Sequence, residues 1–84
     1  MKLIYCWNCY DVFKLDTELR TCKCGRASGK YNKDGYTAIY SGGVPLGFNN
    51  SSLEDALLDR PKSGRGRTFE AFVIPEVCPT MERV

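Results

Sequence analysis

Apolar side chains are spaced along this chain mostly in short runs that favour β-strands, and one stretch alone has the spacing of a helix. The runs typical of strands cover residues 2–5, 10–15, 19–21, 30–32, 36–40 and 69–74. Turn-forming side chains separate them: Asp16 and Thr17 bond readily to their own backbone, and Asp34-Gly35 tolerates the positive φ of a tight turn. The pattern predicts a first strand followed by two β-hairpins, at residues 10–21 and 30–40.

The helical stretch starts near Ser51. Leu53, Ala56 and Leu57 stand at i, i+3 and i+4, which places them on one apolar stripe. Ser51 and the glutamate three residues after it have the spacing of a capping box. The helix ends ahead of Pro61, because the residue before a proline is pushed out of the helical region. We expect a helix of about eight or nine residues, too short to be stable unless it packs on a sheet.

The remaining segments complete the expected fold. Residues 69–74 are apolar on both faces apart from Glu70, as in a central strand covered on both sides. Residues 41–48 contain three glycines and a proline and are expected to be irregular. Residues 76–84 add one edge strand at most. We predict a single domain of the α+β class, a small antiparallel β-sheet with one short helix.

The cysteine content adds a second element to this picture. A chain of 84 residues draws only thin stability from its own core, and domains of this size often carry a disulfide, a metal or an oligomer interface. Five cysteines and no histidine are present, and an odd number leaves one thiol over in a closed disulfide framework. No signal peptide and no apolar segment of about 20 residues is recognisable. We therefore expect a cytoplasmic protein outside the membrane, where clustered cysteines favour a metal.

Four of the cysteines form two pairs in the first part of the chain. Cys6 and Cys9 are separated by two residues, the spacing of a zinc knuckle, in which two sulfurs point at one ion. Gly25 follows the second pair, and a knuckle requires a residue there that accepts positive φ. That pair has one residue between its cysteines instead of two, so Cys78 is the alternative fourth ligand if the tighter turn fails. We predict a structural zinc ion held by Cys6, Cys9, Cys22 and Cys24.

Two other interpretations of these cysteines stay open. Without a metal, reduced cysteines pack as small apolar side chains, and Cys78 is then a buried residue of this kind. Alternatively, Cys6 and Cys9 form a redox pair, although no thioredoxin-like βαβ pattern surrounds them. Both interpretations differ from the zinc hypothesis in predicting a fold that survives a chelator.

Residues 5–25 resemble the four-cysteine version of the zinc-ribbon family, in their two cysteine pairs and the glycine after the second. The resemblance implies a zinc-ribbon hairpin at the N-terminal end and no particular activity, because zinc ribbons serve many functions. The whole chain also looks like small zinc-ribbon proteins of bacteria and their phages, in which the cysteine knot precedes a Pro-Leu-Gly-Phe-like segment and a short helix, as at 45–48 and 51–58. We accordingly divide the domain 1–84 into a zinc-ribbon-like knot, 1–28, and a remainder, 29–84, with a β-hairpin, a short helix and a C-terminal central strand.

Catalysis is not expected of this chain. The absence of histidine removes the commonest general base, and four thiolates would close a zinc site to a catalytic water. No glycine-rich phosphate loop of the known types is present. The sequence instead favours a non-catalytic, zinc-stabilised binding module, a small regulator or inhibitor that acts through protein–protein contacts.

The alternative function is nucleic-acid or nucleotide binding. Most basic side chains lie in two stretches free of acidic residues, 20–33 and 60–67, which would form one cationic face if they met in space. Exposed aromatic side chains would then stack on bases. The small net charge of +2 weakens this interpretation, two solvated loops are the plainer one, and a homo-oligomer is compatible with either function. The candidate binding residues are Arg20, Lys23, Arg26, Lys30, Lys33, Arg60, Lys62, Arg65, Arg67 and Trp7.

Overall fold

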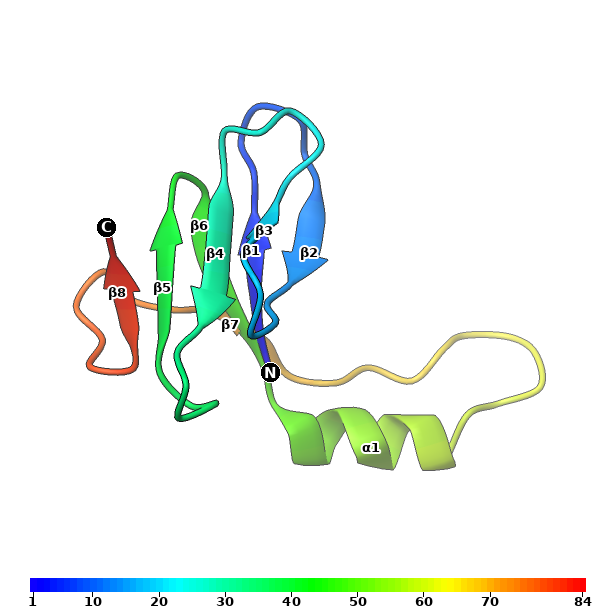
Figure 1. Ribbon diagram of the computed structural model, residues 1–84. Coiled ribbons are helices and arrows are strands. Elements are labelled where there is room, and N and C mark those ends of the chain that lie inside the picture. Colours follow the sequence, from blue (N-terminus) through cyan, green and yellow to red (C-terminus); the bar gives the residue numbers. More distant parts are fainter.

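The computed structural model describes residues 1–84 and consists of two β-sheets with one helix outside them (Figure 1). One sheet has the strand order β2-β1-β6-β7 and the other β3-β4-β5-β8. Along the chain the elements are β1 (Lys2–Tyr5), β2 (Val12–Lys14), β3 (Arg20–Thr21), β4 (Ser28–Tyr31), β5 (Ala38–Ser41), β6 (Val44–Phe48), α1 (Asn50–Leu58), β7 (Ala71–Val73) and β8 (Met81–Arg83). The predicted single small antiparallel sheet of an α+β fold is therefore wrong: the protein is mostly β, in two sheets of four strands each.

The core lies between the two sheets. In Figure 1, β4 and β5 form a layer in front of β1 and β6. Ile4 on β1, Tyr40 on β5 and Met81 on β8 belong to one buried cluster. The chain passes from one sheet to the other at Gly42 and Gly43, both with positive φ, so that β5 and β6 follow each other in sequence but pair in different sheets. Each sheet can thereby bury one apolar face against the other.

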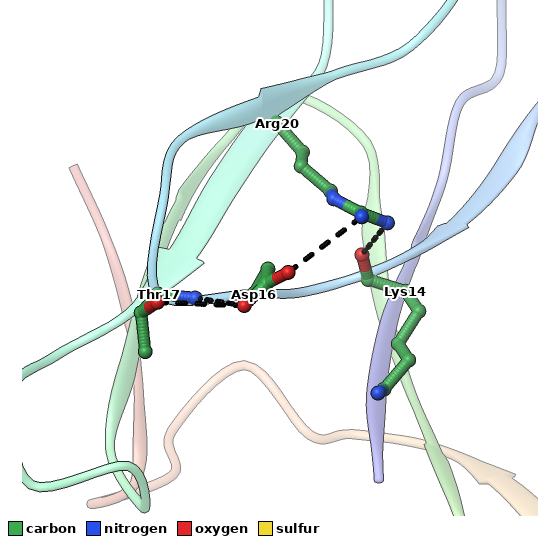
Figure 2. A network of polar contacts seen from close by, with 4 residues as sticks. All are labelled: Lys14, Asp16, Thr17 and Arg20. Carbon is green, nitrogen blue, oxygen red and sulfur yellow. Dashed lines mark hydrogen bonds and ion pairs between the residues drawn. The ribbon is translucent and has the colours of Figure 1, made fainter.

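The predicted hairpin at 10–21 is also wrong, because β2 pairs with β1 and β3 pairs with β4. Leu15 is 1% exposed and lies in the core cluster, so the chain crosses between the sheets after β2 instead of returning beside it. Figure 2 shows how this crossing is fixed: the Arg20 guanidinium donates to the carbonyl of Lys14 at 3.3 Å and lies 3.6 Å from the Asp16 carboxylate. Asp16 in turn accepts the amide of Thr17 at 2.7 Å.

The hairpin predicted at 30–40 is confirmed by the antiparallel pairing of β4 with β5. Asp34 organises its turn, since its Oδ1 accepts the amides of Tyr36 and Thr37, each at 3.0 Å. The amide of Tyr36 and the hydroxyl and amide of Thr37 hold the pKa of Asp34 below its usual range. The turn therefore depends on the ionised carboxylate.

Residues 41–48 are not irregular, since they include the central strand β6 between β1 and β7. Gly47 is a strand residue because its partner Phe72 covers it: a Cβ at position 47 would lie 2.5 Å from Cζ of that ring. The central strand predicted at 69–74 is instead the edge strand β7, and all its residues are exposed. Phe72 keeps 54% of its surface exposed. The C-terminal edge strand is confirmed as β8, which runs parallel to β5.

The predicted helix is confirmed as α1, but its surroundings differ from the expectation. Its N-cap is Asn49, whose side chain accepts the amide of Ser52 at 3.1 Å, and not a Ser51 capping box. The helix has no buried residue. It extends away from both sheets and a loop runs back beside it (Figure 1). No helix of the protein is long and apolar enough to cross a membrane.

We call residues 49–70 the helical arm and the two sheets the body. The arm connects two strands that are direct neighbours, since Phe48 of β6 pairs with Ala71 of β7. It is thus an insertion in a β-hairpin of the body. The arm makes the molecule elongated, with extents of 42 × 28 × 23 Å.

Candidate metal centre

The four cysteines of the two pairs come together at one end of the body. Cys6 and Cys9 lie in the connection between β1 and β2, and Cys22 and Cys24 in the connection between β3 and β4. These connections are at the same end of the molecule in Figure 1, at the top of the view. Because β1 and β3 belong to different sheets, the cluster joins the two sheets.

Both connections are closed by the same backbone hydrogen bond. The amide of Cys6 donates to the carbonyl of Asp11 and the amide of Cys22 donates to the carbonyl of Ala27, each at 2.9 Å. In each case the acceptor lies five residues after the first cysteine of the pair. The two knuckles are therefore closed by the same hydrogen bond, although their cysteines are spaced differently.

The inner turn of each knuckle absorbs that difference in spacing. The amide of Tyr10 donates to the carbonyl of Cys6 at 2.9 Å, whereas the amide of Gly25 donates to the carbonyl of Cys22 at 3.1 Å, one residue closer in sequence. Tyr10 and Gly25 both follow the second cysteine of their pair, and both have positive φ, 60° and 80°. The prediction for Gly25 is confirmed. The same conformation at Tyr10 was missed by sequence reasoning, because a tyrosine there costs about 1–3 kcal/mol and only its place in the knuckle indicates it.

The four sulfurs are close enough to hold a metal ion. All four Sγ atoms lie within 4.8 Å of one another. The Sγ of Cys24 is 3.7 Å from that of Cys6 and 3.4 Å from that of Cys22. A tetrahedral site with metal–sulfur bonds of about 2.3 Å has sulfur–sulfur edges of about 3.8 Å. All cysteines are free thiols, so no disulfide competes for these positions.

Two thiols of the cluster have pKa values shifted in opposite directions. Burial opposes a charged Cys22, but the amide of Ala27, 3.3 Å from its Sγ, and the three other thiols lower the pKa of Cys22 to about 6. At Cys6 the amide of Cys9 favours the thiolate, yet burial and the thiols of Cys22 and Cys24 raise the pKa of Cys6 to about 11. A bound divalent cation would remove this competition and allow four thiolates together.

Cys78 lies outside this group. It is half-buried beside the core cluster, and its Sγ is 3.4 Å from the Thr80 hydroxyl. Hydrogen bonds from the side chain and backbone of Thr80 lower the pKa of Cys78. With Cys22 and Cys24 both in the cluster, the structure does not place Cys78 as a substitute ligand.

The two basic stretches do not meet. Residues 20–26 lie at the cysteine end of the body, whereas residues 60–67 form the loop beside α1 at the far side of the molecule (Figure 1). Arg20 is paired with Asp16, and Arg67 with Asp59 at 2.9 Å. Lys23 and Arg26 lie within or beside the second knuckle, Lys30 lies on β4, Lys33 lies in the β4–β5 turn, and Arg60, Lys62 and Arg65 lie in the arm.

Trp7 is in the first knuckle and keeps 69% of its surface exposed. Its ring meets that of Tyr5 edge to face, with centroids 5.4 Å apart. Tyr10, in the same knuckle, is 74% exposed. Trp7, the aromatic side chain among the candidate binding residues, is therefore exposed, at the opposite end of the body from the arm.

An apolar groove in the arm was missed by sequence reasoning. It lies between α1 and residues 60–70, which run back beside the helix and which we call the returning segment. Its apolar side chains are those of Leu53, Ala56, Leu57 and Phe69. The sequence did contain an indication of this groove, because Leu53, Ala56 and Leu57 stand at i, i+3 and i+4 and form an apolar stripe on the helix. That stripe was expected to pack on a sheet, but it faces the returning segment of the arm instead.

Comparison of the chain with protein-family models, curated proteins and solved structures finds no match. The zinc-ribbon resemblance therefore rests on the sequence pattern described above. The clustering of four thiols in space supports a metal site independently of any family.

Proposed function

We propose that this protein is a non-catalytic binding module, a small regulator or inhibitor whose body is held together by a structural zinc ion and which acts through protein–protein contacts. The observation that carries the proposal is the contrast between the two ends of the molecule. Four thiols converge where the two sheets meet, while the helix at the other end has no buried residue.

Zinc is the metal that suits this set of donors. Cys6, Cys9, Cys22 and Cys24 offer four thiolates, and tetrahedral sites made only of thiolates favour zinc or iron–sulfur centres. The amide of Ala27, which donates to the Sγ of Cys22, supports the ligand as knuckle amides commonly do. A zinc ion bound here would cross-link the two sheets and contribute on the order of 10–16 kcal/mol of apparent binding free energy at neutral pH. With four protein ligands it would have no open position for a substrate or water.

Protein binding is supported by the exposure of apolar side chains in the arm and on the neighbouring edge strand. Leu57 and Leu58 of α1 are 63% and 89% exposed, and Phe72 and Val73 of β7 are 54% and 65% exposed. Neighbouring apolar side chains left in water mark interaction surfaces. The nucleic-acid alternative is less well supported, because the basic stretches 20–33 and 60–67 lie apart and offer no continuous track for a phosphate backbone.

The metal part of the proposal is tested by elemental analysis of protein purified under reducing conditions. We expect a single zinc ion per chain, its loss in the Cys22→Ser variant and its retention in the Cys78→Ser variant. Cys78 is the matched control because it is a half-buried thiol outside the cluster. A zinc-free wild-type protein with an intact fold would contradict the proposal.

The binding part is tested by affinity capture from a cell lysate with and without nuclease, followed by fluorescence anisotropy with a single-stranded oligonucleotide. We expect a protein that stays bound after nuclease treatment. An oligonucleotide that binds tightly at about 50 mM salt and is released at about 200 mM would instead favour the nucleic-acid alternative, because phosphate contacts give a steep salt dependence.

A further inference from the structure

The groove of the helical arm is a built feature with two fixed walls. One wall is α1 and the other is the returning segment, and together they enclose about 340 Å³. Near the body the Ser52 hydroxyl accepts the amide of Glu70 at 2.8 Å. At the far end Arg67 donates through Nε to the carbonyl of Asp59 at 3.2 Å and forms an ion pair with its carboxylate. These ties at both ends keep the two walls at a set spacing.

The floor of the groove is apolar and only partly covered by the chain itself. It is formed by the stripe of Leu53, Ala56 and Leu57 together with Phe69, whose ring meets that of Phe48 edge to face at a centroid distance of 5.1 Å. Leu57 nevertheless remains 63% exposed. A helix of nine residues is marginal in water without apolar packing on its stripe, so a ligand that covers the stripe would be favoured by the burial it adds.

The charged side chains that line this groove, Arg60, Lys62 and Arg67, are all basic. Residues 60–69 contain no acidic side chain. Arg67 is neutralised by Asp59, but Arg60 and Lys62, which also line the groove, form no ion pair. A partner that enters the groove must therefore place its apolar groups between cations. Carboxylates beside those apolar groups would pair with Arg60 and Lys62, which form the rim of the groove. This charge complementarity favours an acidic partner over a basic one.

We infer that the groove binds an acidic segment of a partner protein, with aliphatic or aromatic side chains entering between Leu53, Leu57 and Phe69 and with carboxylates that pair with Arg60 and Lys62. The inference rests on the proposed protein-binding function and names the chemical class of the partner. A nucleic acid fits this floor less well, since bases stack on aromatic rings and two leucines and an alanine form most of the surface.

The experiment selects ligands from a phage-displayed library of random linear peptides on the zinc-loaded full chain. The enriched peptides should combine aspartate or glutamate with leucine or phenylalanine. A synthetic copy of one such peptide should shift the backbone amide resonances of Leu53, Leu57, Gly64 and Phe69 and leave those of Trp7 and Cys24 in place.

A charge exchange gives the sharpest test of the rim. The double variant Arg60→Glu/Lys62→Glu should bind the acidic peptide at least roughly tenfold more weakly, and should gain affinity for the same peptide with lysine in place of its acidic residues. The matched control is Lys14→Glu/Arg83→Glu, which makes the same change of charge at two exposed strand residues outside the groove and should leave binding unaltered. Retained zinc and unchanged dispersion of the amide spectrum show that each variant is folded.

The inference and the proposed function fail in distinguishable ways. Enriched peptides that are not acidic, or that shift Trp7 instead of the groove, overturn the inference while the protein-binding function stands. Amide shifts in the groove that depend on protein concentration alone assign it to a second copy of the chain, and shifts produced by a single-stranded oligonucleotide assign it to nucleic acid; both overturn the inference. No enriched peptide together with no nuclease-resistant partner would reject both.

Discussion

The body and the helical arm hold their backbones in place by opposite means. In the body, Ile4 and Leu15 are almost completely buried and four thiols converge on one point. In the arm, no residue of α1 is buried, and polar ties at Ser52 and Asp59 fix the returning segment. The difference shows that the apolar side chains of this short chain fall into two groups. One part is buried in the body, and another part stays exposed on the arm.

Removal of the metal should have the largest effect on this contrast. The zinc ion would connect sheets that otherwise share only a small core, so a chelator should unfold the body and, with it, the arm that the body anchors. Circular dichroism and amide resonance dispersion measured during a chelator titration report both events. If the chain binds no zinc and keeps its spectrum when the chelator is added, the claim that a metal stabilises the body is wrong.

The next largest effect separates buried from exposed aliphatic side chains. Ile4→Ala removes a side chain that is 0% exposed and should lower the free energy of unfolding by about 2–5 kcal/mol. Leu58→Ala removes one that is 89% exposed and should change it by no more than about 0.5 kcal/mol. Urea denaturation of the zinc-loaded proteins measures both. Equal losses would mean that the arm contributes to the folded core as much as the body does.

A smaller effect is expected from a single methyl group at two glycines. In Gly47→Ala the new Cβ would meet the Phe72 ring at 2.5 Å, so β7 must shift or the ring must leave its place, at a cost of about 1–3 kcal/mol. Gly66→Ala in the arm is the matched control, because its Cβ would meet no atom within 4 Å. Thermal unfolding should show a lower midpoint for the first variant and an unchanged midpoint for the second. Similar midpoints would place Phe72 away from Gly47.

The smallest effect concerns the ion pair that closes the arm. Asp59→Ala should leave global stability nearly unchanged, because exposed ion pairs contribute little. It should nevertheless speed the hydrogen exchange of the amides at 60–66, since the loop loses its tie to Arg67. Asp16→Ala removes the corresponding pair with Arg20 in the body and should leave exchange at 60–66 as it is. If both variants exchange alike in the arm, Asp59 does not fix the groove.

The cysteine site was predictable from the sequence because its ligands are local. Spacing alone indicated two knuckles, and Gly25 marked the turn of the second. The Asp34-Gly35 turn was recognisable for the same reason, since its hydrogen bonds lie within a few residues. The features that could be predicted from the sequence are therefore those determined by residues close to one another along the chain.

The arrangement of the sheets was not predictable in this way, because it depends on pairs distant in sequence. An apolar run at 69–74 fits a central strand as well as an edge strand, and its true place is set by contact with β6. Gly47 resembled a loop residue because nothing in the sequence shows that Phe72 fills the space above it. Leu15 looked like one end of a hairpin strand, although its burial between the sheets sends the chain across the core.

The pairing of Phe48 with Ala71 makes the arm exchangeable as a unit. Strands β6 and β7 are direct antiparallel neighbours, so a two-residue Asn-Gly turn can replace residues 49–70 and close an ordinary hairpin. Insertions of different length at such a position change the loop-closure entropy only slightly, by about 0.6 kcal/mol for each doubling. The body is thus a small scaffold on which loops of other lengths and sequences can be grafted, with the zinc ligands untouched at the other end.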